Sequence, residues 1–433
     1  MRKIMVFLWV FLAGAQPLFA IQVKNTVSLT HPVKNFDVQV SVNESGVKQV
    51  AWIEQQGTQD ILYATTLDPK GQWTPPSLVD RASRIHFSQT YVDPDGKCYV
   101  AWQTTKQNSF AYHLAKKEPG ELWSAPAGIG QLSGVLVFPT IQFLSQQGLT
   151  LSYFQLVRDS QGLISKYAPM CWYYPFSEGQ KKEIEQTKSP EVVKVFDPIV
   201  NSQGKCFFLW SALSSDRQNL LLQGAWLKED KTVGEPITLH QIKSHEKIEF
   251  LKGVMNSKEE IVLMWIHEGA SSKIQVTTLT EGKWSNVGDL AYTRLGFLAL
   301  AIDMDEHGHI VATWRRKDQG AILGSYKAKG EAWTYQEVVI SSSKNVSPHL
   351  IKHDSQGRFV LIYADQKEDT KAIYAATFST TNRKWKHDRL SPAGAYADHF
   401  SFALNSEGNG VIAWRSQYQG GTNQVVVAEL FVD

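Results

Sequence analysis

The sequence predicts an all-β protein, an eight-bladed β-propeller of four-stranded antiparallel blades. Three observations lead to this fold class. A turn followed by an aromatic residue recurs eight times, the repeat is close to 50 residues long, and segments with a helical period are almost absent. A period of this length indicates an array of one supersecondary unit. The two chain ends then favour a closed ring over an open stack.

The repeat is defined by the distance between a turn residue and a later aromatic residue. In six units the turn begins with Asn or Asp, and its glycine lies six positions before the aromatic: Gly46 and Trp52, Gly96 and Trp102, Gly204 and Trp210, Gly308 and Trp314, Gly357 and Tyr363, Gly408 and Trp414. Gly148 lies five before Tyr153, and Glu259 lies six before Trp265. Because these last two turns are imperfect, seven blades is the alternative count.

The first unit shows the four strands in order. Residues 36–42 are rich in β-branched residues, residues 43–46 form a turn, and residues 47–52 pair back as a hairpin. Residues 61–67 form the third strand. A fourth strand begins near Pro75 and Pro76. Since proline has no amide donor, this strand belongs at an outer edge.

Tryptophan recurs with the same period. Of the 14 tryptophans, six are first aromatics described above, and six more follow the first aromatic of their unit at a similar distance: Trp73, Trp123, Trp172, Trp284, Trp333 and Trp385. This regularity indicates residues that wedge one blade against the next. We therefore do not interpret them as an aromatic binding surface.

The chain ends predict how the ring closes. The last unit has only three strands before Asp433, while residues 22–30 form a strand that belongs to no complete unit. An N-terminal strand that completes the last blade removes two exposed edges. The predicted blades are therefore about 36–85, 86–137, 138–195, 196–247, 248–295, 296–346, 347–398, and 399–433 together with 22–30. Residues 181–188 could form a short helix, as an insertion on the third blade.

Residues 1–20 have the layout of a secretory signal peptide. Arg2 and Lys3 precede an apolar run, and small residues suit cleavage after Ala15 or Ala20. The remaining residues, 21–433, form the propeller, in which no stretch is apolar enough to span a membrane. We therefore expect an exported protein, periplasmic or extracellular.

The composition excludes several classes of partner and cross-link. The net charge is +2 and there is no run of five like charges, so nothing favours nucleic acid or an anionic membrane surface. Three cysteines are too few to build the fold through disulfides. Cys98 and Cys206 hold equivalent positions two blades apart, and we expect them to be unbridged and buried.

The turn pattern, with Val or Ile two residues before the aromatic, resembles the repeats of tandem-repeat β-propellers in secreted bacterial proteins. The sialidase-like propellers are the best-known group of this kind. The resemblance covers the whole mature chain and implies the fold. It departs from the sialidase Asp-box, because the position two before the turn glycine never holds aspartate here. Sialidase activity is therefore not implied.

No sequence motif for catalysis, a cofactor or a metal is present. The chain lacks a Gly-x-Ser-x-Gly elbow, a His-Glu-x-x-His zinc helix and a phosphate-binding loop. His307 and His309 flank the glycine of a turn that Asp305 opens, which is the ordinary chemistry of such a turn. We interpret them as turn residues and predict no metal or cofactor.

The candidate binding residues directly follow the aromatics at the ends of the second strands. Loops on one face of a rigid ring commonly carry function. Charged side chains gather there in blades five to eight and one, namely Glu54, His267, Arg315, Arg316, Asp365 and Arg415, whereas blades two to four have none. Arginine grips anionic or polar groups with two parallel hydrogen bonds. We predict a polar pocket on this arc.

The leading interpretation is a secreted, non-enzymatic propeller that binds a protein or a glycan through this face. A glycan-acting hydrolase or lyase is the main alternative, and a structural envelope protein is a third. An enzyme needs carboxylates, or a histidine with a carboxylate, that converge within hydrogen-bond distance. The sequence shows no such convergence, so a binding protein is favoured.

Overall fold

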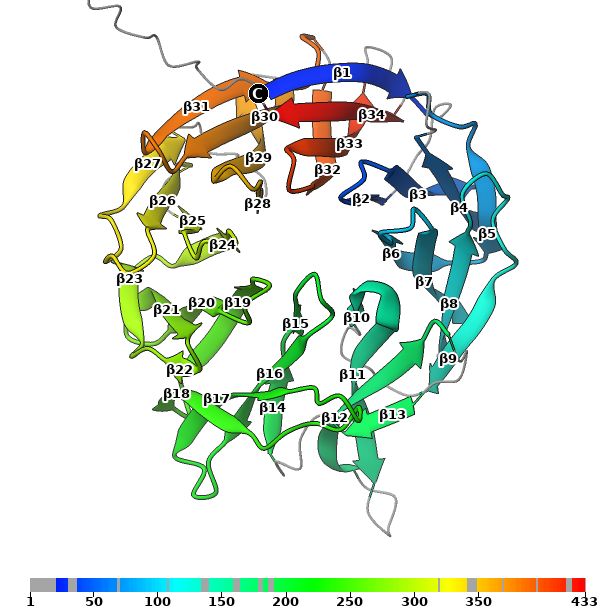
Figure 1. The fold of residues 1–433 in the computed structure, drawn as a ribbon. Helices are drawn as coiled ribbons and strands as arrows, with labels where there is room; N and C mark the ends of the chain where they lie inside the picture. Colours follow the sequence, from blue (N-terminus) through cyan, green and yellow to red (C-terminus); the bar gives the residue numbers. More distant parts are fainter. Residues whose placement is uncertain are drawn as a thin grey trace, which may run out of the picture.

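The computed structural model describes residues 21–29, 37–67, 71–106, 109–133, 140–158, 164–177, 182–185, 191–317, 320–340, 349–367, 370–394, 396–417 and 423–432. These residues form eight antiparallel sheets arranged radially around a central channel (Figure 1). The predicted eight-bladed propeller is therefore confirmed, and the seven-bladed alternative is wrong. The predicted signal peptide, residues 1–20, lies outside the described residues.

Each blade is ordered from an inner strand beside the channel to an outer edge strand. The strands of blades one to four are β2 (Val38–Val42), β3 (Lys48–Gln56), β4 (Gln59–Thr66), β5 (Ser77–Ala82); β6 (Ile85–Val92), β7 (Cys98–Lys106), β8 (Ser109–Lys117), β9 (Ala127–Ser133); β10 (Thr140–Phe143), β11 (Gly148–Arg158), β12 (Ile164–Pro175), β13 (Lys182–Glu185); β14 (Val192–Val195), β15 (Ile199–Val200), β16 (Cys206–Leu213), β17 (Asn219–Trp226), β18 (Ile237–Lys243). β14 and β15 both pair with β16 and share the inner position of blade four.

Blades five to eight repeat this order. Their strands are β19 (Lys247–Met255), β20 (Ile261–Glu268), β21 (Ser272–Thr280), β22 (Lys283–Trp284), β23 (Gly288–Thr293); β24 (Phe297–Met304), β25 (Ile310–Arg316), β26 (Ile322–Lys327), β27 (Glu337–Ile340); β28 (Leu350–His353), β29 (Arg358–Lys367), β30 (Thr370–Ser379), β31 (Lys384–Arg389); β32 (Tyr396–Leu404), β33 (Asn409–Gln417), β34 (Asn423–Val432), β1 (Ile21–Ser28). A 3₁₀ turn, η1 (Ser145–Gln147), precedes β11. The short helix expected within residues 181–188 is wrong where the structure describes it, because β13 occupies Lys182–Glu185.

The N-terminal strand closes the ring. β1 pairs antiparallel with β34 as the outermost strand of blade eight, from Ile21 opposite Val432 to Ser28 opposite Val426, with one shift of register between Lys24 and Val27. In Figure 1, β1 and β34 therefore lie side by side. A buried ion pair between blades eight and one supports this junction, with Glu429 Oε2 2.5 Å from Lys48 Nζ. The predicted closure is confirmed.

The Asn or Asp turns interlock around one end of the channel. Asn43 Oδ1 accepts the amide of Val47 within its own turn, while Asn43 Nδ2 donates to the carbonyl of Asp93 in the next blade, at 2.7 Å. Asn405 Nδ2 donates to the carbonyl of Asn43 at 3.1 Å and joins blade eight to blade one. Gly46 has a φ of 81°, in the left-handed region that favours glycine. An asparagine at the first position of the turn, such as Asn43, therefore shapes its own turn and joins it to the turn of a neighbouring blade.

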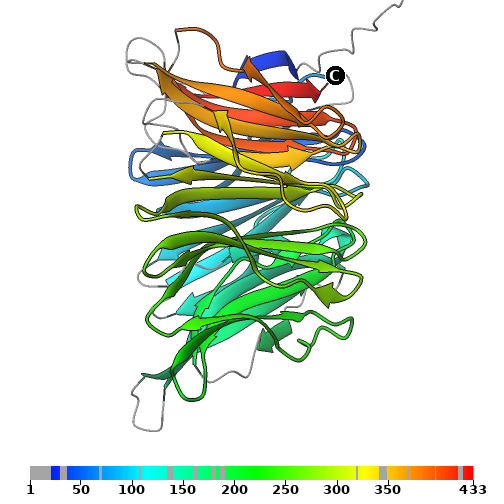
Figure 2. The same cartoon turned by 90° about the vertical axis from the view of Figure 1, so that its left-hand side faces the viewer.

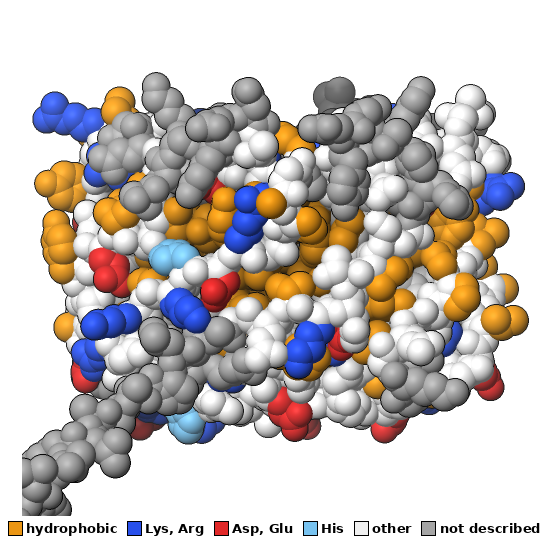
Figure 3. All heavy atoms as spheres, turned by 90° about the horizontal axis from the view of Figure 1, so that it is seen from above, with side chains coloured by type: hydrophobic (Ala, Val, Ile, Leu, Met, Phe, Trp, Pro, Cys, Tyr) orange, Lys and Arg blue, Asp and Glu red, His pale blue; other side chains and the backbone are white. Residues whose placement is uncertain are grey.

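The recurring aromatics fill the spaces between blades. In the six units whose repeat aromatic is a tryptophan, that residue is 0 % exposed: Trp52, Trp102, Trp210, Trp265, Trp314 and Trp414. Trp414 packs with Ile362 and Ala364 of the preceding blade. Figure 2 shows the ring edge-on, and Figure 3 shows hydrophobic side chains in a band across the rim that carries β1. Burial between blades rather than ligand contact thus accounts for these residues.

Two other features concern the whole chain. Cys98, Cys171 and Cys206 are free thiols, and all three are buried. Burial raises the pKa of Cys98 and of Cys171 to about 12, so both thiols are protonated and unreactive at neutral pH. In the part of the chain that the structure describes, no helix has the length and apolar character needed to cross a bilayer.

Candidate functional site

The propeller has two chemically different faces. We call the side that carries the Asn and Asp turns the turn face, and the opposite side the loop face. Because neighbouring strands are antiparallel, the second strand of each blade leaves the turn face and ends at the loop face. Glu54, His267, Arg315, Arg316, Asp365 and Arg415 lie near the ends of second strands, in β3, β20, β25, β29 and β33. All six therefore belong to the loop face.

Glu54 is held by its own blade. Its side chain accepts the indole N–H of Trp52 at 2.7 Å and a hydrogen bond from Gln56 at 3.2 Å, and the residue is 7 % exposed. A buried tryptophan N–H needs an acceptor. Glu54 supplies that acceptor for the Trp52 wedge, which gives it a structural role.

Arg415 binds a neighbouring carboxylate. Its Nε and Nη2 donate to Oδ1 and Oδ2 of Asp398, both at 2.6 Å. His399 Nδ1 lies 2.9 Å from the same carboxylate, and Lys371 Nζ lies 3.8 Å away. Burial opposes ionisation of Asp398, but the hydrogen bonds from Arg415 and His399 outweigh it, so its pKa is lowered. This cluster is cationic overall and lies at the start of the inner strand of blade eight.

The other predicted residues form separate environments. His267 Nε2 lies 3.2 Å from Glu246 Oε2, and its ring is near that of His240. Arg315 lies beside His349, a buried histidine whose pKa burial lowers to about 4, with the nearby arginine adding to the effect. The six residues thus share one face of the ring, and Glu54, His267 and Arg415 each have a polar partner there.

A feature that the sequence analysis missed is a set of β-bulges at the start of the inner strands. The strand register slips there in five blades, between Ile85 and Phe87, Val192 and Lys194, Glu249 and Lys252, Phe297 and Ala299, and Asp398 and Phe400. A bulge adds one residue and re-aims its side chain. The exposed residues at these bulges are His86, Val193, Phe250, Leu298 and His399. They project at the loop-face end of the channel.

Phe250 is an apolar bulge residue with a left-handed backbone, which among these five residues His399 shares with a φ of 44°. It is 53 % exposed and has a φ of 49°, in the left-handed region that side chains with a β-carbon rarely adopt. The sequence carries a signal for this bulge, because the alternation of apolar and polar residues from Ile248 to Phe250 breaks at the apolar Leu251. That break could have identified the extra residue.

Phe250 and Leu298 open onto a shallow groove between blades five and six, which we call the loop-face groove. Its volume is about 780 Å³, and it is lined by His245, Lys247, Glu249, Phe250, Glu268, Gly269, Ala270, Phe297, Leu298 and Lys317. Leu295, on the connection just before Phe297, is 61 % exposed. The groove therefore combines an apolar floor with charged side chains of both signs.

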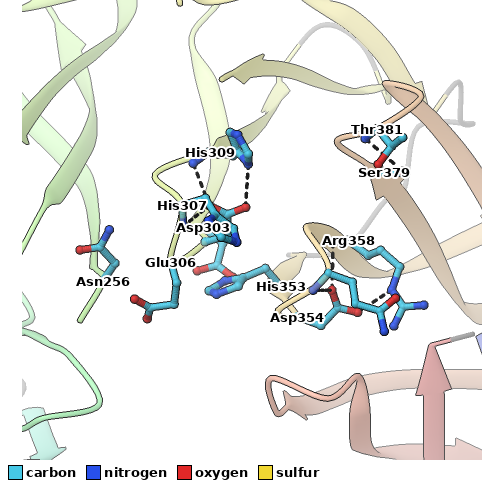
Figure 4. A network of polar contacts seen from close by, with 12 residues as sticks. Asn256, Asp303, Glu306, His307, His309, His353, Asp354, Arg358, Ser379 and Thr381 are labelled. Atoms are coloured by element: carbon cyan, nitrogen blue, oxygen red, sulfur yellow. Dashed lines mark hydrogen bonds and ion pairs between the residues drawn. The ribbon is translucent and has the colours of Figure 1, made fainter. Parts of the chain in front are cut away.

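A second cavity of about 470 Å³ lies in the channel towards the turn face, lined by inner strands and turns of blades one and three to eight. His353 Nδ1 lies 2.8 Å from Asp303 Oδ2 in its wall (Figure 4). Burial lowers the pKa of His353, but the charge and hydrogen bond of Asp303 raise it more, and the net shift is upward. Glu306, also in Figure 4, accepts the amide of Ser257 in the neighbouring turn at 3.1 Å.

The described residues contain no group of three or more His, Cys, Asp or Glu side chains placed to hold a metal ion. His309 Nδ1 lies 2.9 Å from Asp305 Oδ2, and the Asp305 carboxylate also accepts the amides of His307 and His309. His309 thus belongs to its turn, as the sequence predicted.

The comparisons with known proteins concern the fold. No protein-family model and no curated protein matches the sequence. Among solved structures, the chain is similar to an ulvan lyase of polysaccharide lyase family PL25, with 9 % identity, 92 % of this chain and 93 % of that chain covered, and a TM-score of 0.51. It is also similar to prolyl oligopeptidase B from Galerina marginata, with 12 % identity, 89 % of this chain and 55 % of that chain covered, and a TM-score of 0.50. At these identities the likeness shows a β-propeller fold and nothing about activity.

Proposed function

We propose that this protein is an exported, non-enzymatic β-propeller that binds a protein or a glycan through its loop face, with the loop-face groove as the contact site. Phe250 is the observation that carries the proposal. A left-handed backbone costs a residue with a β-carbon about 1–2 kcal/mol, and an exposed phenyl ring also forgoes burial. A strained backbone together with an exposed aromatic side chain is typical of a functional position.

The surroundings of Phe250 suit a ligand with an apolar face and a polar perimeter. Leu298, from the neighbouring blade, extends the apolar surface, and both residues line the groove. Lys247, Lys317, Glu249 and Glu268 also line it, which makes its charge balanced. A balanced rim around an aromatic centre is the usual composition of a recognition surface. The signal-peptide pattern of residues 1–20 supports export.

The test is a binding survey with matched variants. The mature chain is immobilised and exposed to a bacterial envelope extract and to a glycan array. We expect a ligand whose binding falls at least tenfold in Phe250→Gly and Leu298→Ala and is unchanged in Leu122→Ala, which removes an apolar side chain that is 85 % exposed outside the groove. Equal binding by all three variants would place the contact elsewhere and refute the proposal.

A second candidate function is a glycan-acting enzyme, and the pair of His353 and Asp303 favours it. A histidine oriented by a carboxylate is a common general base. His353 and Asp303 line the channel cavity, where a substrate chain could reach them. Purified wild-type protein should then depolymerise a polysaccharide, and His353→Gln should abolish that activity without changing the unfolding temperature by more than a few degrees. No activity on a polysaccharide panel leaves the binding function as the conclusion.

A further inference from the structure

A third hollow lies on the turn face between blades two and three. Its volume is about 470 Å³, and Tyr99, Tyr174, Phe176, Asp95, Lys97 and Glu118 are among the residues that line it. We call it the tyrosine cleft. It is separate from the loop-face groove, which opens on the opposite side of the ring. A volume in this range is typical of sites for small molecules.

Stacked aromatic rings form one wall of the tyrosine cleft. The rings of Tyr99 and Phe176 lie 4.3 Å apart and are nearly parallel, with an angle of 5° between their planes. Tyr91, which stacks on Phe143 at 5.3 Å, lies behind this wall, 6.0 Å from Tyr99. Tyr99 is 6 % exposed and forms the base, whereas Phe176 and Tyr174 are only partly buried. Phe176 and Tyr174 therefore offer aromatic surface to the cleft.

These tyrosines depart from the repeat that builds the rest of the propeller. Tyr99 lies six residues after the first turn residue, where most other blades hold Gln49, Phe207, Val262, Val311, Val360 and Val411. Tyr91 lies two residues before that turn residue, where Ser41, Ile199, Val254, Asp303, Lys352 and Ala403 stand. Six other blades thus pack without a tyrosine at either position. Packing of a blade does not by itself require these two residues.

Charged side chains of both signs surround the aromatic wall. Lys97 Nζ lies 3.4 Å from Glu118 Oε2, and Lys116 Nζ lies 4.0 Å from Glu118 Oε1. The side chains of Lys97 and Glu118 are 37 % and 32 % exposed, so both remain accessible to a ligand. Asp93 lies deeper and accepts the hydroxyl of Tyr99 at 3.4 Å. Donors and acceptors therefore alternate around the rim.

We propose that the tyrosine cleft binds a segment of a neutral oligosaccharide. A sugar ring has a face of weakly positive C–H bonds that meets the negative face of an aromatic ring. Its hydroxyl groups donate to carboxylates such as Glu118 and accept from ammonium groups such as Lys97. Lys97 and Lys116 repel a cationic ligand, and Asp93, Asp95 and Glu118 repel an anionic ligand. A neutral ligand avoids both repulsions. This site is independent of the proposed loop-face function.

The test uses isothermal titration of the mature chain with cellohexaose and N-acetylchitohexaose, and with hexagalacturonate as an anionic counterpart. We expect one-to-one binding of at least one neutral hexamer. Tyr174→Ala and Phe176→Ala should weaken it at least tenfold, and Phe176→Tyr should restore it. Phe250→Gly, on the other face, should bind as the parent does, which separates this site from the loop-face groove.

A rim variant covers the case in which the aromatic variants fail to fold. Glu118→Gln keeps the size of the side chain and removes its charge, and we expect it to weaken binding several-fold while the protein unfolds at the same temperature. The proposal is overturned if neither neutral hexamer binds, if hexagalacturonate binds more tightly, or if Glu118→Gln and the folded aromatic variants bind as the parent does.

Discussion

Arg415 and Asp398 form two parallel hydrogen bonds, Nε to Oδ1 and Nη2 to Oδ2, each 2.6 Å long. Asp398 is 3 % exposed, so the arginine neutralises a buried charge. The sequence pattern predicts that Arg415 binds a ligand. Its guanidinium already has a carboxylate partner within the protein, and its first role is to hold the start of β32 against β33.

We therefore expect Arg415→Ala to destabilise the protein. Removing one partner of a buried ion pair leaves an uncompensated charge and typically costs about 3–5 kcal/mol. Lys371 and His399 stay near Asp398, which places the expected loss at the lower end of that range. Denaturant unfolding measures the loss, and Arg81→Ala, an exposed arginine on β5, is the matched control. Equal stability of the two variants would contradict the structural role.

The same pair predicts a dependence on pH. The pKa of Asp398 is lowered in the folded state, so its contribution to stability is present above the usual pKa of an aspartate, about 3.9. It is lost as the pH falls through the folded-state value. The stability difference between parent and Arg415→Ala should thus be constant near neutral pH and shrink in acid. A difference that grows in acid would refute this assignment.

The junction between the first and last blades predicts a second sensitive pair. Glu429 Oε2 lies 2.5 Å from Lys48 Nζ. Glu429 Oε1 accepts a hydrogen bond from Nδ2 of Asn25, in β1, also at 2.5 Å. Glu429→Ala leaves Lys48 buried without its charge partner, and we expect a loss of about 3–5 kcal/mol in the free energy of unfolding. Glu407→Ala, exposed in the same blade, should change it by less than about 0.5 kcal/mol.

Deletion of residues 21–28 tests the same closure by a different route. Without β1, the edge of β34 is unpaired and free to pair with another chain. We expect aggregation or a large fall in the unfolding temperature, measured by light scattering and calorimetry. A truncated protein that stays monomeric and unfolds like the parent would show that β1 does not close the ring.

His353 and Asp303 predict a dependence on pH of opposite sign. The folded-state pKa of His353 is raised, so its pairing with Asp303 stabilises the fold fully below the unfolded pKa of histidine, about 6.5. This contribution is lost as the pH rises through the folded-state value. The stability difference between parent and Asp303→Asn should be larger at about pH 5.5 than at about pH 8.5. A difference that is independent of pH would show that His353 is not charged in the pair.

The backbone of Phe250 predicts a gain in stability on substitution. Glycine adopts a φ of 49° without strain, so Phe250→Gly should raise the free energy of unfolding by up to about 1 kcal/mol. Val193 is a bulge residue of similar exposure whose φ is not in this region, and Val193→Gly should lower stability by a similar amount. Calorimetry compares the two. Destabilisation by Phe250→Gly would show that the ring is needed for packing.

Local sequence signals predicted most of the fold. The spacing from Gly46 to Trp52 follows from one hairpin, and it recurs because each blade is built from contacts between residues that are close in sequence. The strand at residues 22–30 was predicted by counting strands, since the last unit lacked one. Glu259 was predicted to hold a glycine position, and its φ of 61° agrees.

Only the tertiary structure decided which side chains meet. Arg415 and Asp398 are 17 residues apart and pair because a bulge shifts the register of β32. Tyr99 and Phe176 come from different blades and stack only because the ring sets those blades side by side. The sequence period determines how a blade folds, whereas pairs across blades depend on twist and bulges that act over long sequence distances. The number of blades and the closure could therefore be predicted from the sequence, but the loop-face groove and the tyrosine cleft could not.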